Sequence, residues 1–211
     1  MSSATRLPAA QRREQLVDAA IRVMTREGVA QATTRAIVAE ADVSLSVFHY
    51  CFAAKQDLIE AVIDSIMEHV SARAMATIAP GATAEEAIRG AFQAYWDHVI
   101  AEPEEHLFTY ELTQYALRTP GFDAIARRQY GRYVGAILTF LDQLTTSLDV
   151  ELRTPPDVLG RYVASLLDGL TLNYLLLGDT DGAQAVLDTA ADHVITHITG
   201  RVWVPSTTRQ S

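Results

Sequence analysis

Two short runs of the chain place small polar and cationic side chains where helices are expected to begin. Thr34 and Arg35 open one short helix, and Ser44, Leu45 and Ser46 open the next. Amides at a helix N-terminus, with hydroxyl and guanidinium groups beside them, bind phosphate, and neighbouring side chains can reach base edges. The pattern is compatible with DNA contact. It also suits ordinary caps in a small helical subdomain, and periodicity alone leaves both interpretations open.

Enzymatic and metal chemistry have less support. The sequence contains no G-x-S-x-G motif, Gly-rich phosphate loop, H-E-x-x-H motif or paired Glu-x-x-His motifs. His193 and His197 are four residues apart and could share a metal, but surface histidines are the commoner interpretation without a third ligand. The acidic ridge of Glu60, Asp64 and Glu68 is most simply a solvated face. We expect no catalytic residue, no metal and no cofactor.

The elements that position these residues are expected to be helices, because apolar residues recur at helical spacing throughout. Leu16, Ala20, Val23 and Met24 form one such stripe, which ends at Gly28. The seven prolines and eleven glycines cluster at a few sites, which disfavours an all-β fold. The sequence predicts an all-α fold of about nine helices, with a DNA-binding domain at residues 1–54 and a helical bundle at 55–211.

Residues 1–54 have the organisation of a helix-turn-helix. Two short helices follow the first one, and the tight turn Ala41-Asp42-Val43 joins them, with Asp42 at a position that favours left-handed backbone. In this motif the third helix enters the major groove and the second lies across the DNA backbone.

The stretch from Arg13 to Ile63 carries a set of residues in one specific order and spacing, without a gap: Ala19-Ala20, Glu27-Gly28, Thr33-Thr34-Arg35, Ala41-Asp42-Val43-Ser44, Phe52, Lys55 and Leu58. With these residues it resembles the N-terminal domain of tetracycline-repressor (TetR/AcrR-type) regulators. The resemblance implies that Thr34, Ser44 and Lys55 contact phosphates. It also implies that Arg35 reaches a base or a phosphate.

The sequence departs from that family in the turn and in the third helix. Asp42 replaces the usual glycine, and His49 replaces a usual tyrosine. His49 can donate to phosphate but is shorter, whereas Leu45 can read only thymine methyls or DNA shape. Base specificity is therefore expected to rest on Arg35, Ser46 and Tyr50.

The middle helices contain many aromatic residues, with isolated polar residues among apolar neighbours. A mostly apolar cavity with a few polar groups is typical of small-molecule sites, and the resemblance implies an effector pocket here. The expected ligand-binding residues are Phe92, Trp96, Phe108, Glu111, Gln114, Tyr115, Tyr133, Asp168 and Asn173. An aromatic stripe is more often plain core, and an arginine such as Arg118 or Arg132 could pair with Glu111 or Asp168 and make them structural.

The last two helices are apolar over more than one face, so each is buried in its own core or against a partner. Because a palindromic operator needs two heads, we expect a homodimer through these helices. Residues 1–55 hold seven basic and five acidic residues, although the chain carries a net charge of −9. This distribution is compatible with DNA binding through the N-terminal head.

The single cysteine, Cys51, and the lack of a long apolar stretch predict a soluble cytoplasmic protein without a membrane partner. The predicted function is a ligand-responsive DNA-binding transcriptional regulator, a repressor that a small molecule releases from a palindromic operator. Two alternatives stay open: a DNA-binding protein with no effector, and a helical ligand carrier whose head has lost DNA binding.

Overall fold

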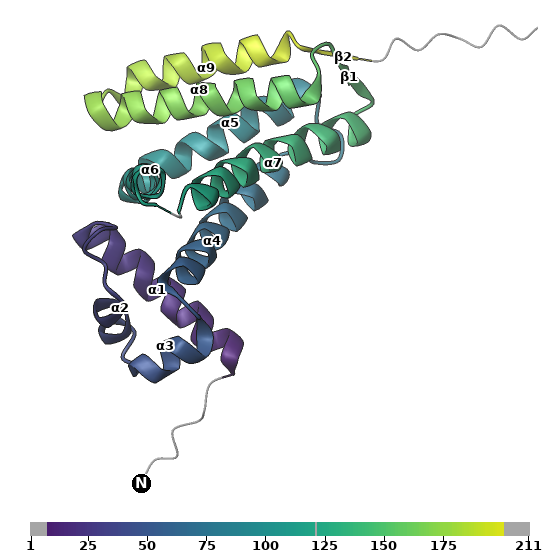
Figure 1. Cartoon of the computed structure of the whole chain (residues 1–211). Helices are drawn as coiled ribbons and strands as arrows, with labels where there is room; N and C mark the ends of the chain where they lie inside the picture. Colours follow the sequence, from purple (N-terminus) through teal and green to yellow (C-terminus); the bar gives the residue numbers. More distant parts are fainter. Residues whose placement is uncertain (1–7, 121, 201–211) are drawn as a thin grey trace, which may run out of the picture. The chain divides into compact units, whose positions relative to one another are not determined.

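The computed structural model describes residues 8–120 and 122–200, and over these residues the chain is almost entirely helical (Figure 1). The described elements are α1 (Ala9–Glu27), α2 (Thr34–Glu40), α3 (Leu45–Cys51), α4 (Lys55–Met75), α5 (Ala84–Ala101), α6 (Pro103–Arg118), α7 (Asp123–Ser147), β1 (Val150–Leu152), α8 (Pro156–Leu177), α9 (Thr180–Ile195) and β2 (Ile198–Gly200). The all-α prediction is confirmed, and the described residues form nine α-helices.

The chain divides into two compact units. The N-terminal unit comprises residues 1–71 and 98–133, and the C-terminal unit comprises 72–97 and 134–211. Helices α4, α5 and α7 therefore contribute residues to both units. The sequence predicts a boundary between residues 54 and 55 that separates a DNA-binding role from an effector-binding role. The division into compact units does not test these roles, so this boundary stays a prediction.

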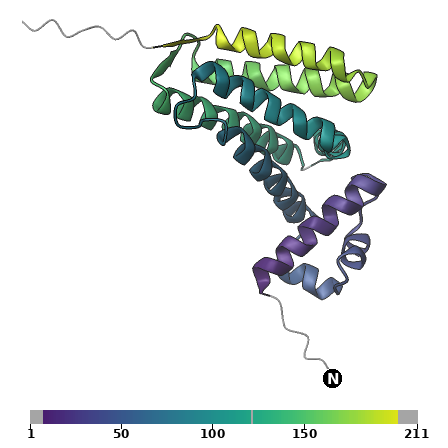
Figure 2. The same ribbon diagram turned by 180° about the vertical axis from the view of Figure 1, so that it is seen from behind.

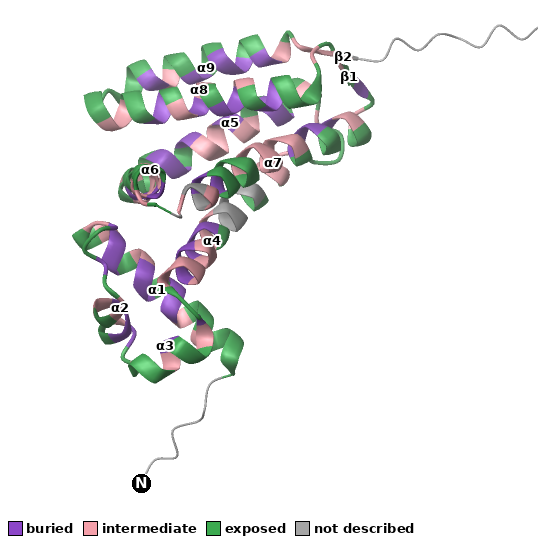
Figure 3. Cartoon of the chain, viewed as in Figure 1, coloured by how far each residue is buried: buried purple, intermediate pink, exposed green. Residues whose placement is uncertain are grey.

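The core of the N-terminal unit forms around the apolar stripe of α1. Leu16, Ala20, Val23 and Met24 are fully buried, as their spacing predicts (Figure 3). Apolar side chains from the other helices of this unit complete the cluster: Ile37, Val38, Phe48, Phe52, Leu58, Ile59, Val62, Ile63, Phe108 and Leu112. Helix α6 thus shares one core with the helix-turn-helix.

In the C-terminal unit, α8 and α9 lie side by side (Figures 1 and 2). Gly178 ends α8 in the left-handed conformation, with φ at 67°, and Asp179 caps α9 by accepting a hydrogen bond from Gly182 N at 3.0 Å. None of the helices in the described part of the chain is long and apolar enough to span a membrane.

A reciprocal cap opens α5, as the Thr83-x-x-Glu86 spacing predicts. Thr83 N donates to Glu86 Oε2 at 2.8 Å, and Glu86 N donates to Thr83 Oγ1 at 3.2 Å. The backbone N–H and then the hydroxyl of Thr83 lower the pKa of Glu86, because both donate to its ionised form.

The two strands were not expected from the sequence. The helical spacing of Leu187, Val194 and Ile198 predicts that the last helix reaches Ile198. In the structure α9 ends at Ile195, and β2 pairs antiparallel with β1, with Leu152 opposite Ile198 and Val150 opposite Gly200. The prediction was wrong here because a three-residue strand is too short to show alternation and forms only with its distant partner.

Candidate nucleic-acid interface

The turn between α2 and α3 is fixed by short-range hydrogen bonds. Thr33 caps α2 by accepting from Ala36 N at 3.1 Å, and Val43 N donates to Val38 O at 3.0 Å. Asp42 has a φ of 51°, the left-handed backbone predicted for it. Gln15 of α1 donates to Ala41 O at 2.8 Å, which ties the turn to the first helix.

Helix α3 is anchored to the core from one side. Phe48 is only 1% exposed, and its ring centroid lies 5.7 Å from that of Phe52. Arg13 of α1 donates to Cys51 O at 2.8 Å, and its guanidinium lies 4.2 Å from the Phe52 ring centroid. These contacts fix the orientation of α3 on α1.

The opposite side of α3 is open to solvent. Leu45, Ser46 and His49 are exposed, and 73% of Tyr50 is accessible. Four of the predicted DNA-contacting residues therefore share an exposed helix surface, backed by Phe48. Such a surface is what base readout in a major groove requires, and the individual contacts stay predictions.

The remaining predicted contacts lie at helix N-termini. Arg35 is exposed and Thr34 is half-buried, both in the first turn of α2. Ser44 occupies the N-cap position of α3, but its hydroxyl makes a 2.7 Å hydrogen bond with that of Ser46 and caps no backbone amide.

Lys55 and Glu111 both bind the backbone of Val29, in the loop between α1 and α2. Lys55 Nζ donates to Val29 O at 3.2 Å and lies 5.8 Å from the Tyr115 ring centroid. Burial lowers the pKa of Lys55. Glu111 Oε1 accepts from Val29 N at 2.8 Å. One residue of the loop is thus held by α4 through its carbonyl and by α6 through its amide.

Glycine is required beside this contact. Gly28 has a φ of 85°, and a Cβ built on it would lie 2.9 Å from Glu111 Oε1. The partner of Glu111 is thus the backbone amide of Val29 and not one of the arginines considered in the sequence analysis. Arg132 instead pairs with Asp64. Glu111 has a structural contact, and a ligand contact stays a prediction.

The acidic ridge on α4 is not simply solvated. Glu60 forms an ion pair with Arg128, as Asp64 does with Arg132, so α4 and α7 are joined within the N-terminal unit. The side chain of Glu68 lies outside the described ones. Asp64 is exposed and Glu60 is half-buried, so the ridge is a surface face that also carries ion pairs, and the partners in these pairs lie far along the sequence.

The expected ligand-binding residues fall into both units. In the N-terminal unit, Phe108 is part of the apolar core, Gln114 is exposed, Tyr115 packs edge-on against Phe122 at 5.8 Å, and Tyr133 packs against Tyr130 at 6.0 Å.

In the C-terminal unit, Phe92 is buried and Trp96 is fully buried, 4.9 Å from the Tyr174 ring centroid. Asp168 is half-buried and Asn173 is exposed. The Trp96 Nε1–H has no hydrogen-bond acceptor within the described part of the chain. A buried donor without an acceptor is costly, so a bound molecule could supply one.

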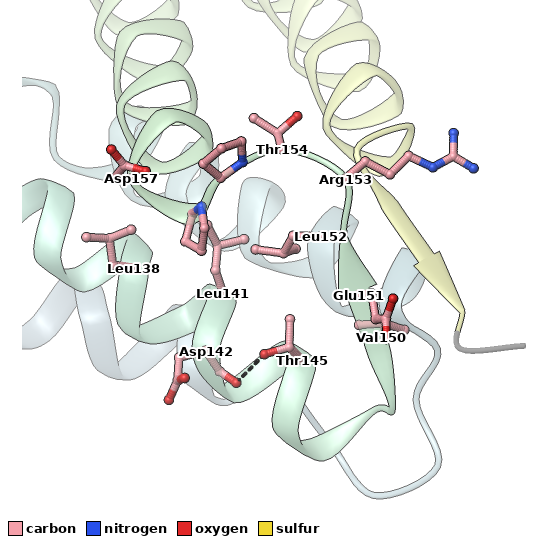
Figure 4. A pocket seen from close by; sticks show the side chains of 12 residues that line it. Leu138, Leu141, Asp142, Thr145, Val150, Glu151, Leu152, Arg153, Thr154 and Asp157 are labelled. Atoms are coloured by element: carbon pink, nitrogen blue, oxygen red, sulfur yellow. Dashed lines mark hydrogen bonds between the residues drawn. The ribbon is translucent and has the colours of Figure 1, made fainter.

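A groove of about 990 Å³ lies elsewhere in the C-terminal unit, between the end of α7, β1 and the start of α8 (Figure 4). Its lining mixes apolar residues such as Leu141 with carboxylates such as Asp157, and it includes none of the nine expected ligand-binding residues. A smaller hollow of about 340 Å³ includes Phe92 with Arg89 and Leu187.

Comparison with known proteins supports this geometry along most of the chain. Residues 16–62 match the tetR family of bacterial regulatory proteins, and residues 84–199 match the C-terminal domain of BetI-type transcriptional repressors. The chain is 29% identical over 174 residues to the nicotine-responsive repressor HdnoR of Paenarthrobacter nicotinovorans, covering 80% of this chain and 86% of HdnoR. It is 26% identical over 193 residues to the regulator BetI of Brucella canis, covering 90% and 93%.

Solved structures agree. A putative TetR-family regulator from Rhodococcus sp. shares the fold with a TM-score of 0.72 at 20% identity, covering 88% of this chain and 98% of that one. The multidrug binding protein EbrR, solved with imidazole, gives a TM-score of 0.62 at 26% identity, with 90% and 96% covered. The chain belongs to the tetR family of bacterial regulatory proteins and is a ligand-responsive transcriptional repressor.

Proposed function

We propose that this repressor reads a palindromic operator through α3 and the start of α2. The observation that carries the proposal is the division of α3 between a buried Phe48 and an exposed surface of Leu45, Ser46, His49 and Tyr50. Ser46 and Tyr50 can hydrogen-bond to base edges, and Leu45 can contact thymine methyls. Arg35 supplies a bidentate donor at the start of α2.

The phosphate contacts in this proposal come from Thr34, Ser44, His49 and Lys55. Phosphate contacts fix the register of a protein on DNA and carry no sequence information, so they are separable from base contacts by experiment.

We assign the dimer contact to α8 and α9. The inner leucines Leu167 and Leu170 are buried within the C-terminal unit, whereas an outer apolar row is exposed by 47–75%: Val158, Leu172 and Leu176 on α8 and Val186 on α9. Large apolar side chains exposed on one pair of helices suit a protein–protein contact, and regulators of this family act as dimers. A second copy that covers this row would present two α3 helices to a palindrome.

We propose a small aromatic nitrogen base as the effector class. HdnoR is named for its response to nicotine, and EbrR was solved with imidazole. Both molecules carry an aromatic nitrogen whose lone pair accepts a hydrogen bond. The buried Nε1–H of Trp96 lacks an acceptor among the described residues and could donate to such a nitrogen.

Selection of binding sites from random duplex DNA tests the operator proposal. A palindromic consensus is expected, and Arg35→Ala should cost about 1–3 kcal/mol at one base position if Arg35 reads a base. Lys55→Ala should instead weaken binding to all sequences alike. Arg153→Ala, which removes an exposed cation that follows β1, is the matched control and should leave affinity unchanged. Failure to enrich any sequence would refute the proposal.

Titration of the operator complex with nicotine and, separately, imidazole tests the effector class. At least one is expected to release the DNA, and Trp96→Phe should weaken that release by roughly tenfold because one neutral hydrogen bond is lost. Tyr174→Phe keeps the edge-on ring and serves as the control. Equal release from the Trp96→Phe protein would show that Nε1 does not bind the effector.

A further inference from the structure

Two histidines at the end of α9 form a pair that neither DNA binding nor effector binding uses. His193 lies in the last turn of α9, and His197 follows four residues later. Thr196 keeps helical backbone, with φ at −63° and ψ at −19°, and His197 N donates to Val194 O at 3.0 Å. The helical path therefore continues past Ile195 and brings the two rings together, with centroids 5.2 Å apart and planes at 75°.

Each ring is oriented through its Nδ1 atom by a hydroxyl from elsewhere in the C-terminal unit. His193 Nδ1 lies 2.5 Å from the Tyr162 hydroxyl, and His197 Nδ1 lies 2.7 Å from Thr154 Oγ1. When Nδ1 carries the proton and donates it to the hydroxyl oxygen, the lone pair is on Nε2. Neither Nε2 makes a hydrogen bond to any residue that the structure describes. Metal-binding histidines typically have this arrangement, because a second partner fixes the tautomer and the ring.

The ring spacing also fits a shared metal ion. At zinc–nitrogen distances of about 2.0–2.1 Å, two imidazoles on a tetrahedral ion have centroids roughly 5 Å apart. The observed 5.2 Å agrees with that spacing. Imidazole nitrogen is a preferred ligand of Zn²⁺.

We propose that His193 and His197 bind one Zn²⁺ through their Nε2 atoms. Among the described residues no group of three or more His, Cys, Asp or Glu side chains could hold a metal, so water completes the coordination. Tyr162 and Thr154 are positioning residues that hold the rings without touching the ion. The ion would join the end of α9 to the turn that leads into β2.

Calorimetric titration of the untagged full chain with ZnCl₂ tests the proposal. One Zn²⁺ per chain is expected, and His193→Ala or His197→Ala should each abolish binding or weaken it at least about tenfold. Tyr162→Phe should keep the stoichiometry and weaken binding roughly tenfold, because only the partner of Nδ1 is lost. Thr189→Ala, one turn earlier on α9, is the matched control and should bind like the wild type.

Circular dichroism melting without zinc checks that each variant is folded. We expect the variants to fold because His193 is exposed and the pair lies at the surface of the chain. Two results would overturn the proposal. One is no heat of binding for the wild type at about 100 μM zinc, a concentration at which a specific site should be occupied. The other is unchanged zinc affinity in the His193→Ala/His197→Ala double variant, which would place zinc elsewhere on the chain.

Discussion

Phe48→Ala is expected to destabilise the N-terminal unit by about 3–5 kcal/mol and to abolish operator binding. Phe48 is 1% exposed and packs on Phe52 within the shared core of this unit. Helix α3 has seven residues, too few to be stable alone, so its orientation depends on this side chain. Urea unfolding followed by circular dichroism gives the stability, and fluorescence anisotropy with labelled operator gives the affinity.

Two controls separate anchoring from DNA contact. Phe48→Leu retains most of the buried volume and should cost less than about 1.5 kcal/mol. Leu45→Ala changes the exposed side of α3 and should leave stability within about 0.5 kcal/mol while it changes affinity. Wild-type stability in the Phe48→Ala protein would contradict the anchoring role.

Acidification is expected to destabilise the protein through His106. His106 Nε2 lies 3.1 Å from His98 Nδ1, and His98 Nε2 lies 3.7 Å from a carboxylate oxygen of Glu105. Burial, and then the charge of His98, lower the pKa of His106 from 6.5 to about 4. The unfolded chain therefore binds more protons than the folded chain between these values. Stability should fall as pH falls from 6.5 towards 4, by about 2–3 kcal/mol in all.

Urea unfolding at pH 7.5, 6 and 5 measures this loss. His106→Gln should be less stable than the wild type at pH 7.5 but should lose less stability on acidification, because the titrating group is gone. His49→Gln, which changes an exposed histidine of α3, should keep the wild-type pH dependence. An equal loss in the His106→Gln protein would assign the effect to other groups.

Features fixed by neighbours in the sequence were predicted correctly. The left-handed Asp42, the end of α1 at Gly28 and the Thr83–Glu86 cap each depend on atoms a few residues apart. The alternation on α3 between buried Phe48 and exposed neighbours follows from the same short-range periodicity.

Contacts between distant residues could not be predicted. Glu111 and Val29 are separated by 82 positions, and Glu60 and Arg128 by 68. Periodicity marks Phe108 as an apolar-face residue, but it does not reveal that this face belongs to the core of the helix-turn-helix. The expected ligand-binding residues therefore include core positions such as Phe108 together with other positions. An aromatic residue at helical spacing gives the same sequence pattern whether it lies in a core or lines a pocket.

The double hold on Val29 has a consequence for protein engineering. A chimera that exchanges the first 54 residues with those of a relative must form again the bonds that α4 and α6 make to the backbone of the α1–α2 loop. Grafting a new reading head onto this sensor therefore requires a glycine at position 28 and a loop amide placed to meet Glu111. A donor without that pair would lose the bond between the α1–α2 loop and α6, so the new head would be held on α6 by apolar packing.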